Sequence, residues 1–393
     1  MFNKSFSVII SQKIHSYKKD IKVDSDKSIS IRSFLIGSIS HDISRVENIL
    51  ESDDVFSTIN CLRKLGVKIL KKESGKYLIY GKGLGSLYIK RNSLLDFGNS
   101  GTLARLLIGI LSTTPNINVK IKGDKSLNKR NMSKVIGLMS EFGAQFYPKN
   151  KFNLPLKLTS SEMPIGIKYE SGVSAQLKSA VILAGSNSYG TTTIIEKRES
   201  RNHTENILLK NSFKTIKIKK NRKKESLIKI HGKNYLNPLK MYIPGDPSSA
   251  AFFVALTLLN KKSLLKIKNV CLNPRRIGFY KLLKKNGGKI LFKNIKKKNN
   301  EIIGDIIVKS SKLRSLRAGA DYYTSLTDEY PIIFVIAALT PGISIFSGIK
   351  DLANKESNRI EEMKKILKQI GVKCKTSKDK MIIKGLKDHK FKN

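Results

Sequence analysis

The chain has 393 residues, 40% of them hydrophobic, and its 75 Lys and Arg residues against 30 Asp and Glu give a formal net charge of +45. A chain of this length exceeds one small core and predicts two domains, and no apolar run approaches the ~20 residues that a membrane-spanning helix requires. Its three cysteines, Cys61, Cys271 and Cys374, are far apart and odd in number, and they form no metal motif and no evident disulfide framework. We therefore expect a protein of the reducing cytoplasm that does not act at a membrane.

The large positive charge raises the question of nucleic-acid binding. Only 14 of the 75 basic residues are Arg, the residue suited to bidentate and stacked recognition, and the Lys residues are scattered among Asn and Ile. We interpret the charge as a property of solvated surface that also attracts small anions, and we do not expect a nucleic-acid partner. A basic nucleic-acid-binding protein stays open as an alternative, and it predicts tight binding with a steep salt dependence.

Five apolar helices are predicted along the chain, and each opens with a small polar or acidic cluster. The openings lie near Ser28, Ser100, Ser174, Ser248 and Asp328, at steps of 72, 74, 74 and 80 residues. The unpaired N–H groups at a helix N-terminus form a natural anion site. Several such ends gathered around one cleft would hold a highly anionic substrate.

A second series of amphipathic helices alternates with the first. Each ends in Gly or Asn, residues that favour a left-handed C-cap, and a strand follows. The five ends lie near Gly66, Gly143, Asn211, Gly287 and Gly371. Two helices and several strands thus recur about every 75 residues, the kind of period that marks repeated units. Three units fall between about residues 25 and 243 and two follow, and the same spacing would put a sixth opening a little past residue 400.

Eight motifs in this pattern resemble those of the EPSP synthases, a family of enolpyruvyl transferases. They are KSISIR at 27–32, GNSGT at 98–102, SLNKRNM at 126–132, SAQLKS at 174–179, SRNHTE at 200–205, GDPSSA at 245–250, DEYP at 328–331 and KESNR at 355–359. The resemblance extends from about residue 27 to residue 381. Three positions depart from the family pattern, with Asn131 in place of Pro and with Asn202 and Asn358 in place of Asp.

The resemblance implies a fold of the α/β (α+β) class. It is a two-domain inside-out α/β barrel of repeated βαβαββ units, with the last unit incomplete. One domain would comprise residues 1–25 and 245–393, and the shikimate-phosphate-binding domain would comprise residues 26–244. The family continues with an Asp-His-Arg helix, a strand and a final helix, which Asp388, His389 and Lys390 match poorly. We therefore expect an enzyme truncated at its C-terminus, with exposed apolar surface in the discontinuous domain.

The family transfers the enolpyruvyl group of phosphoenolpyruvate to the 5-hydroxyl of 3-phosphoshikimate. The products are 5-enolpyruvylshikimate 3-phosphate and phosphate, on the shikimate pathway to chorismate and the aromatic amino acids. The resemblance implies this activity, with the two small molecules as partners and with no metal or organic cofactor, and we expect a cytoplasmic monomer. Substrates that carry phosphates and carboxylates require Lys, Arg, hydroxyl groups and helix N–H groups, the residue types of the motifs.

The resemblance also implies roles for individual residues. Asp328 would be the base toward the 5-hydroxyl, and Glu356 and Lys27 would handle the proton at the enol methylene. The residues implied to bind 3-phosphoshikimate are Lys27, Ser28, Arg32, Ser174, Ala175, Gln176, Ser200, Arg201, Asp328 and Lys355. The residues implied to bind phosphoenolpyruvate are Lys27, Asn99, Gly101, Arg130, Gln176 and Arg359.

Some of these residues also have a plainer structural interpretation. Asp328 is of a type preferred at helix N-caps, and for Asp246, Ser248 and Ser249 capping is the favoured interpretation. His203 is expected to order its loop rather than to act as an acid.

Two further functions stay open as alternatives. One is a UDP-N-acetylglucosamine enolpyruvyl transferase, which usually carries a reactive Cys in a mobile loop, whereas no Cys lies near Arg130 in this sequence. The other is an inactive truncated remnant.

Overall fold

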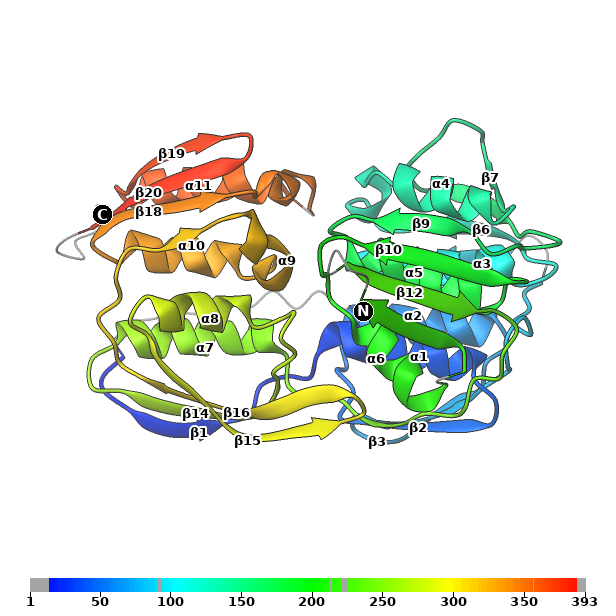
Figure 1. Ribbon diagram of the computed structural model, residues 1–393, viewed down its shortest axis with the longest axis horizontal. Coiled ribbons are helices and arrows are strands. Elements are labelled where there is room, and N and C mark those ends of the chain that lie inside the picture. The colour runs from blue at the N-terminus through cyan, green and yellow to red at the C-terminus, as the bar shows by residue number, and fades with distance from the viewer. Residues whose placement is uncertain (1–13, 91–92, 213, 221–224, 356, 387–393) are drawn as a thin grey trace.

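The structure, a computed structural model, describes residues 14–90, 93–212, 214–220, 225–355 and 357–386. These residues form two lobes that lie side by side, and helices lie inside each lobe with sheets on its outer walls (Figure 1). The arrangement is the two-domain inside-out α/β fold that the motifs implied.

All sheets share one strand order, in which a parallel pair is followed by two antiparallel neighbours. The first lobe has three sheets: β13 (Lys240–Tyr242), β2 (Ile43–Glu47), β4 (Lys76–Tyr80) and β3 (Ile69–Glu73); β5 (Leu94–Asp96), β6 (Asn118–Lys122), β8 (Leu156–Thr159) and β7 (Gln145–Tyr147); β9 (Lys168–Ser171), β10 (Thr191–Glu196), β12 (Ser226–His231) and β11 (Ile216–Lys220). The second lobe has two: β1 (Lys18–Ile21), β14 (Leu264–Cys271), β16 (Glu301–Lys309) and β15 (Lys289–Lys298); β17 (Arg317–Ala318), β18 (Gly342–Ser347), β20 (Lys380–Gly385) and β19 (Lys373–Ser377). The described residues thus form five complete sheets of this type and no sixth.

The chain crosses twice between the lobes. Strand β1 pairs with β14 in the second lobe, whereas β13 pairs with β2 in the first, so the two units that begin with these strands each span both lobes. The two crossing segments are hydrogen-bonded to each other, since Asp26 N donates to Pro244 O and Asp246 N donates to Asp24 O, both at 2.8 Å. This double connection fixes the start of the next helix in each lobe.

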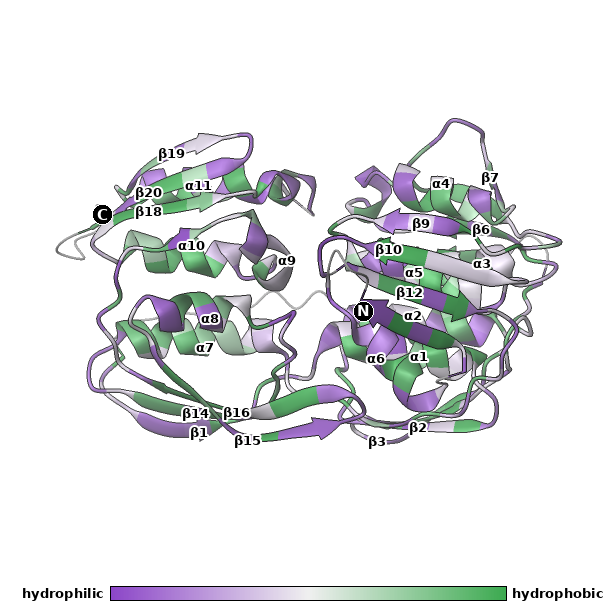
Figure 2. Cartoon of the chain, in the orientation of Figure 1, coloured by the Kyte–Doolittle hydropathy of each residue, from purple (hydrophilic) through white to green (hydrophobic). Residues whose placement is uncertain are grey.

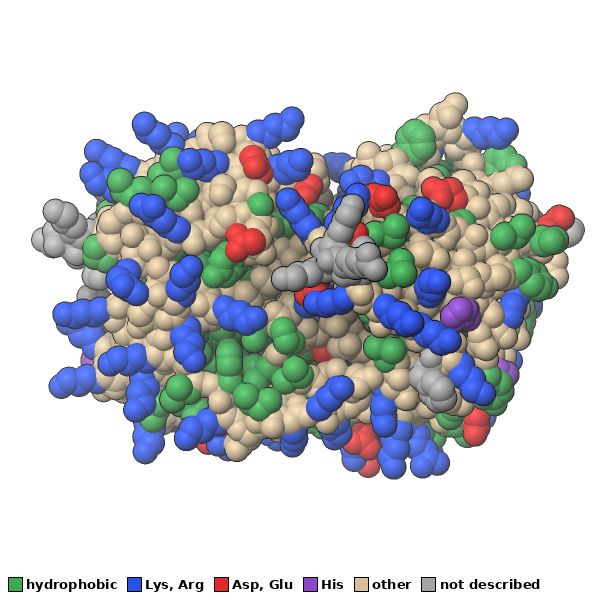
Figure 3. All heavy atoms as spheres, in the orientation of Figure 1, with side chains coloured by type: hydrophobic (Ala, Val, Ile, Leu, Met, Phe, Trp, Pro, Cys, Tyr) green, Lys and Arg blue, Asp and Glu red, His purple; other side chains and the backbone are tan. Residues whose placement is uncertain are grey.

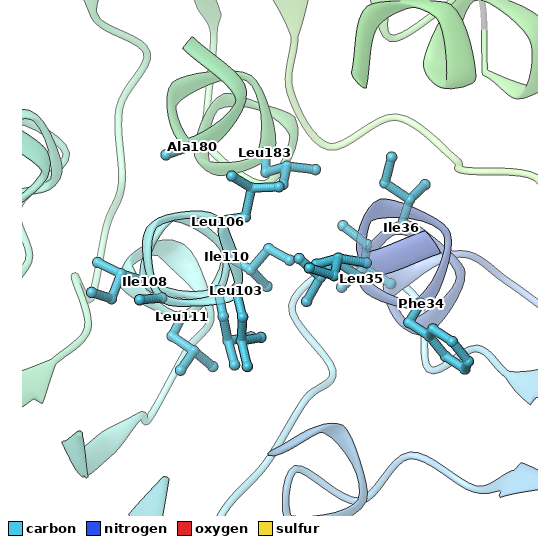
Figure 4. Close-up of a cluster of buried hydrophobic side chains, with 14 of the residues drawn as sticks. Phe34, Leu35, Ile36, Leu103, Leu106, Ile108, Ile110, Leu111, Ala180 and Leu183 are labelled. Carbon is cyan, nitrogen blue, oxygen red and sulfur yellow. The ribbon is translucent and has the colours of Figure 1, made fainter. Parts of the chain in front are cut away.

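Three helices form the centre of the first lobe: α1 (Lys27–Ile39), α3 (Gly101–Thr113) and α5 (Ala175–Ser186). Their apolar side chains are buried and lie in one cluster, in which those of Leu35, Leu106, Ile110 and Leu183 lie close together (Figure 4). Burying each such side chain contributes about 1.5–3 kcal/mol. These helices are buried on all sides, which explains why they carry an apolar run rather than a single apolar stripe.

The outer helices end largely as the sequence predicts. They are α2 (Asp53–Lys64), α4 (Ser133–Glu141), α6 (His203–Asn211), α8 (Gly278–Lys285) and α11 (Arg359–Gln369). Gly66, Gly143, Gly287 and Gly371 follow four of them with φ between 81° and 97°, which confirms the left-handed ends. Helix α6 ends at Asn211 as predicted, but the left-handed conformation predicted there is wrong: Asn211 stays helical, and its side chain donates to the Ile207 carbonyl one turn back.

The second lobe is built around α7 (Pro247–Leu259) and α10 (Tyr330–Ala338), which carry mostly hydrophobic residues (Figure 2). Its shorter helical segments are η2 (Ala320–Tyr322), α9 (Tyr323–Leu326) and η3 (Lys350–Asn354), and the first lobe has η1 (Leu127–Lys129). On α7, Phe252, Phe253 and Leu256 are 61%, 45% and 40% exposed, whereas the apolar residues of α1 and α3 are buried. This exposure is the apolar surface that was expected in the lobe.

Candidate active site

The five apolar helices begin within two residues of their predicted openings. Ser100, Ser174, Asp246 and Asp26 cap α3, α5, α7 and α1, each accepting a backbone N–H on its side chain. Capping is therefore confirmed for Asp246.

Capping is wrong for the other three candidates. Ser248 and Ser249 lie within the first turn of α7, and the Ser248 hydroxyl donates to Glu329 on the neighbouring segment. Asp328 precedes the cap position of α10, which Glu329 occupies, so its carboxylate is available for other partners.

Arg276 joins the starts of α1, α7 and α10. Its side chain is only 3% exposed, and its Nη2 lies 3.4 Å from Asp26 Oδ2 and 3.0 Å from Asp246 Oδ1. Its Nη1 lies 3.3 Å from Asp328 Oδ2. Burial raises the pKa of both Asp246 and Glu329, although the charge of Arg276 opposes the rise.

Asp328 is the point at which cations from both lobes meet. Its Oδ2 lies 2.6 Å from Arg201 Nη2 of the first lobe, and its Oδ1 lies 3.7 Å from Arg359 Nη1 of the second. Burial by itself raises the pKa of Asp328. The positive charges of Arg201, Arg276 and Lys355 lower this pKa by a larger amount, so the net pKa is well below the ordinary value. The carboxylate is therefore ionised at neutral pH.

Lys27 lies at the first turn of α1 on the cleft side. Its ammonium is 2.9 Å from Asp54 Oδ2, and its side chain is 50% exposed. Burial lowers its pKa, but the bond to Asp54 and the charges of Asp246 and Asp328 raise it, and the net shift is upward. Lys27 is thus a charged, accessible group within the electrostatic reach of the second lobe.

The starts of α3 and α5 are linked by polar side chains. Gln176 Nε2 donates to Thr102 Oγ1 at 2.9 Å, and Gln176 Oε1 accepts from Arg105 Nη1 at 2.9 Å. A Cβ on Gly101 would lie 2.5 Å from Arg130 Nη1. Gly101 therefore lets the Arg130 guanidinium approach the N-terminus of α3, which forms a cationic site beside helix N–H groups.

Arg32 is buried between α1, α5 and α6. Its Nε donates to Thr204 Oγ1 at 2.9 Å, its Nη2 to Ser179 Oγ at 3.2 Å and its Nη1 to the Ser28 carbonyl at 3.0 Å. Burial lowers the pKa of Arg32 to about 10, which still leaves the guanidinium charged at neutral pH.

Ser200 lies in the turn between β10 and α6 and is 1% exposed. Its N–H and its hydroxyl both donate to Glu196 Oε1 at 2.9 Å. Arg275 of the second lobe donates to the Ser200 carbonyl at 2.9 Å. The structure thus holds this serine inside a polar network, and its hydroxyl would have to exchange partners to bind a ligand.

Two cavities of about 420 and 370 Å³ lie between the lobes. Both are lined by Arg198, two residues before Ser200, and by Ala320 of the second lobe, and one reaches Val173 beside Ser174. None of the predicted site residues is among those that line the two cavities.

The remaining predicted residues are placed as follows. Ala175 is the first residue of α5, and Ser174 immediately precedes it as the cap. Asn99 is exposed next to the start of α3, and half-buried Lys355 acts electrostatically on Asp328. Glu356 lies outside the described residues, and so does the segment 388–390.

Arg276, Arg275, Glu196 and Asp54 were not predicted as site residues. Two consecutive Arg residues in a chain with only 14 were a usable signal for the first two, because Arg suits buried ion pairs. Glu196 ends an ordinary strand and carries no sequence signal. His203 orders its segment as expected, since its Nδ1 lies 2.8 Å from Glu301 Oε1.

The basic side chains on the face seen in Figure 3 do not gather in one patch. On the face seen in Figure 3, Lys and Arg side chains are spread over both lobes, and Asp and Glu are fewer. Within the described ranges, no cluster of three or more His, Cys, Asp or Glu side chains could hold a metal ion. None of the helices described is long and apolar enough to traverse a bilayer.

Comparisons with known proteins agree on one family. The profile of EPSP synthase (3-phosphoshikimate 1-carboxyvinyltransferase) matches residues 11–392. The 3-phosphoshikimate 1-carboxyvinyltransferase of Zymomonas mobilis is 39% identical over 378 residues, which cover 96% of this chain and 83% of that protein. The protein of the same name from Paramagnetospirillum magneticum is 38% identical over 364 residues, covering 92% and 81%. A solved structure of EPSP synthase from Acinetobacter baumannii has a TM-score of 0.81 and 32% identity, covering 94% of this chain and 82% of that one.

Proposed function

The chain belongs to the EPSP synthase family, and we propose on this premise that it transfers the enolpyruvyl group of phosphoenolpyruvate to the 5-hydroxyl of 3-phosphoshikimate. The products are 5-enolpyruvylshikimate 3-phosphate and phosphate, in the shikimate pathway to aromatic amino acids. The observation that carries the proposal is the meeting of Arg201, Arg276 and Arg359 around Asp328 at the starts of helices from both lobes. Such a site suits substrates that carry several negative charges.

Binding of 3-phosphoshikimate is proposed for residues on α1, α5 and the turn before α6, with contributions from the second lobe. They are Lys27, Ser28, Arg32, Ser174, Ala175, Gln176, Ser200, Arg201, Asp328 and Lys355. The N-terminus of α5 supports the phosphate end, because its first N–H groups are an anion site. Arg32 is charged and buried against the hydroxyl groups of Thr204 and Ser179, and its positive charge supports a role toward the ring carboxylate.

Binding of phosphoenolpyruvate is proposed for residues around the start of α3 and on the second lobe. They are Lys27, Asn99, Gly101, Arg130, Gln176 and Arg359. The close approach of Arg130 to Gly101 supports this assignment, because it combines a guanidinium with helix N–H groups. Arg359 lies across the cleft near Asp328 and would engage when both substrates are present.

The chemistry consists of an addition followed by an elimination. The 5-hydroxyl oxygen attacks C2 of phosphoenolpyruvate while a proton adds to its methylene carbon, and the hydroxyl proton passes to a base. The tetrahedral intermediate then loses phosphate as the C2–O bond breaks, and a methyl proton leaves to restore the enol. We assign the base to Asp328 and the proton transfers at the methylene to Lys27 and Glu356.

The state of Asp328 fits this assignment. Its low pKa reflects the surrounding cations, above all Arg201, so it is ionised before substrate binds. Substrate phosphates and carboxylates would draw Arg201 and Lys355 away and make the carboxylate a stronger base. The cations would thus serve binding first and then release the base for proton abstraction.

We further propose that residues 1–25 with 245–393 form one domain and residues 26–244 the other. The two buried apolar clusters support this division, because one runs from Ile29 to Ile243, with Cys271 in addition, and the other from Ala250 to Ile383. We also propose a cytoplasmic monomer, in which all the side chains of the site come from one chain.

The test is to incubate the purified chain with both substrates and to follow phosphate release and the product by ³¹P NMR. We expect product only when both substrates are present. Calorimetry should show that 3-phosphoshikimate binds in the absence of phosphoenolpyruvate. The absence of both binding and turnover would overturn the proposal.

A further inference from the structure

The turn that carries Ser200 is held from both lobes at once. Glu196 of the first lobe accepts the N–H and the hydroxyl of Ser200 on one oxygen, and its other oxygen lies 3.1 Å from Arg275 Nη1 of the second lobe. The same Nη1 donates to the Ser200 carbonyl at 2.9 Å. Every polar group of Ser200 is therefore bonded to this pair of residues.

The pair is well shielded from water. The Glu196 side chain is fully buried and that of Arg275 is 17% exposed. Lys178 Nζ also lies 2.6 Å from Glu196 Oε1, so the carboxylate is shared between a first-lobe cation and a second-lobe cation. Arg275 has a second anionic partner, Glu199, at 3.1 Å from its Nη2.

The following residues are held by the second lobe in the same way. Glu301 on β16 accepts from His203 Nδ1 at 2.8 Å and from Asn206 Nδ2 at 3.0 Å. Asn273, two residues before Arg275, donates to Asn202 Oδ1 at 2.9 Å. The segment from the end of β10 into α6 is thus held in place by hydrogen bonds and ion pairs from the second lobe.

We propose that Arg275 is a positioning residue that orients Ser200 for the phosphate of 3-phosphoshikimate. This inference rests on the proposed function of the site. A serine hydroxyl has one proton to donate, so binding a phosphate oxygen requires it to leave Glu196. Arg275 then stays paired with Glu196 and bonded to the Ser200 carbonyl. The turn therefore stays in place while the Ser200 hydroxyl moves from Glu196 to the phosphate.

The first experiment compares Arg275→Met with the wild-type chain by calorimetric titration of 3-phosphoshikimate and by steady-state kinetics. We expect the Kd and the KM for 3-phosphoshikimate to rise at least about tenfold, as for loss of a charge-assisted hydrogen bond, with kcat at saturation within about threefold. Arg275→Lys should restore part of the affinity because it keeps a cation at Glu196. Thermal unfolding of each variant verifies that it is folded.

The matched control is Lys268→Met. Lys268 is also a second-lobe cation, but it pairs with Asp20 of its own lobe on the surface, with side chains 41% and 55% exposed. We expect its Kd to stay within about twofold of the wild-type value. Equal weakening by Lys268→Met and Arg275→Met would assign the effect to net charge and overturn the proposal.

A double-mutant cycle tests whether Arg275 acts through Ser200. Ser200→Ala alone should weaken binding, and adding Arg275→Met should then cost less than about twofold more. If Arg275→Met binds like the wild type, or if its effect has the same size in the Ser200→Ala background, the inference is wrong. A wild-type chain that does not bind 3-phosphoshikimate would instead contradict the proposed function.

Discussion

Arg201 and Asp328 meet across the cleft, with 2.6 Å between Nη2 and Oδ2, and so connect the turn before α6 to the segment before α10. The pair joins a residue proposed to bind phosphate to the residue proposed as the base. A substrate anion that attracts Arg201 must weaken this pair, and substrate binding therefore changes the basicity of Asp328.

We expect Asp328→Asn to lower kcat by a factor of about 10² to 10⁴, the usual contribution of a positioned general base. The amide keeps the size of the side chain but does not accept the hydroxyl proton. Phosphate release at saturating substrates measures the effect, and calorimetry should show that 3-phosphoshikimate still binds. Asp20→Asn, on the surface strand β1, is the control. A kcat within threefold of the wild type would remove Asp328 from the mechanism.

We expect Gly101→Ala to raise the KM for phosphoenolpyruvate about tenfold, which corresponds to about 1.4 kcal/mol. The added methyl would lie 2.5 Å from Arg130 Nη1 and 2.9 Å from Arg105 Nη1, so the flexible guanidinium ends must move. The fold should persist, since Ala suits a helix better than Gly. Kinetics with each substrate varied in turn provide the measurement, and an unchanged KM for phosphoenolpyruvate would argue against the proposed role of Arg130. Gly137→Ala, where an added methyl meets nothing within 4 Å, is the control.

The repeated helix openings were predictable because capping and apolar runs are local features of the sequence. The exchange of β1 and β13 between lobes was implied by the family resemblance, and local pattern alone would not have shown it. The Glu196–Arg275 and Arg276–Asp26 pairs could not be predicted, because they join residues 79 and 250 positions apart that only the double crossing brings together. At Asn211 the helix end was predictable but the left-handed conformation was not, and the Asn211 side chain bonds back into its own helix.

We expect Lys178→Met to destabilise the first lobe by about 3–5 kcal/mol. Lys178 Nζ lies 2.6 Å from both Glu196 and Glu205, and all three side chains are at most 1% exposed. Removing the cation takes away the buried ion-pair partner of Glu205 and one of the two cations beside Glu196, which keeps Arg275. Urea unfolding followed by far-UV circular dichroism measures the change. Lys197→Met, whose pair with Glu170 is on the surface, should change stability little, and equal losses from the two variants would contradict the argument.

The cross-lobe residue Glu301 should make stability depend on pH. Burial by itself raises the pKa of Glu301. His203, Asn206 and Asn273 lower this pKa by a larger amount, so the folded pKa lies below the unfolded value of about 4.3. A carboxylate with a lowered folded pKa stabilises the fold fully above the unfolded pKa, and this stabilisation is lost as the pH falls through the folded pKa. Glu301→Gln should therefore cost about 1–3 kcal/mol at pH 7.

The difference between Glu301→Gln and the wild type should then shrink as the pH falls from about 5 to 3, because the wild-type carboxylate becomes neutral as well. Urea unfolding at a series of pH values measures it. Glu73→Gln alters an exposed pair with Lys76 and should give a nearly constant, small difference over the same range. A constant gap for Glu301→Gln from pH 7 to about 3 would show that its ionised form is not what holds His203 and Asn206 to the second lobe.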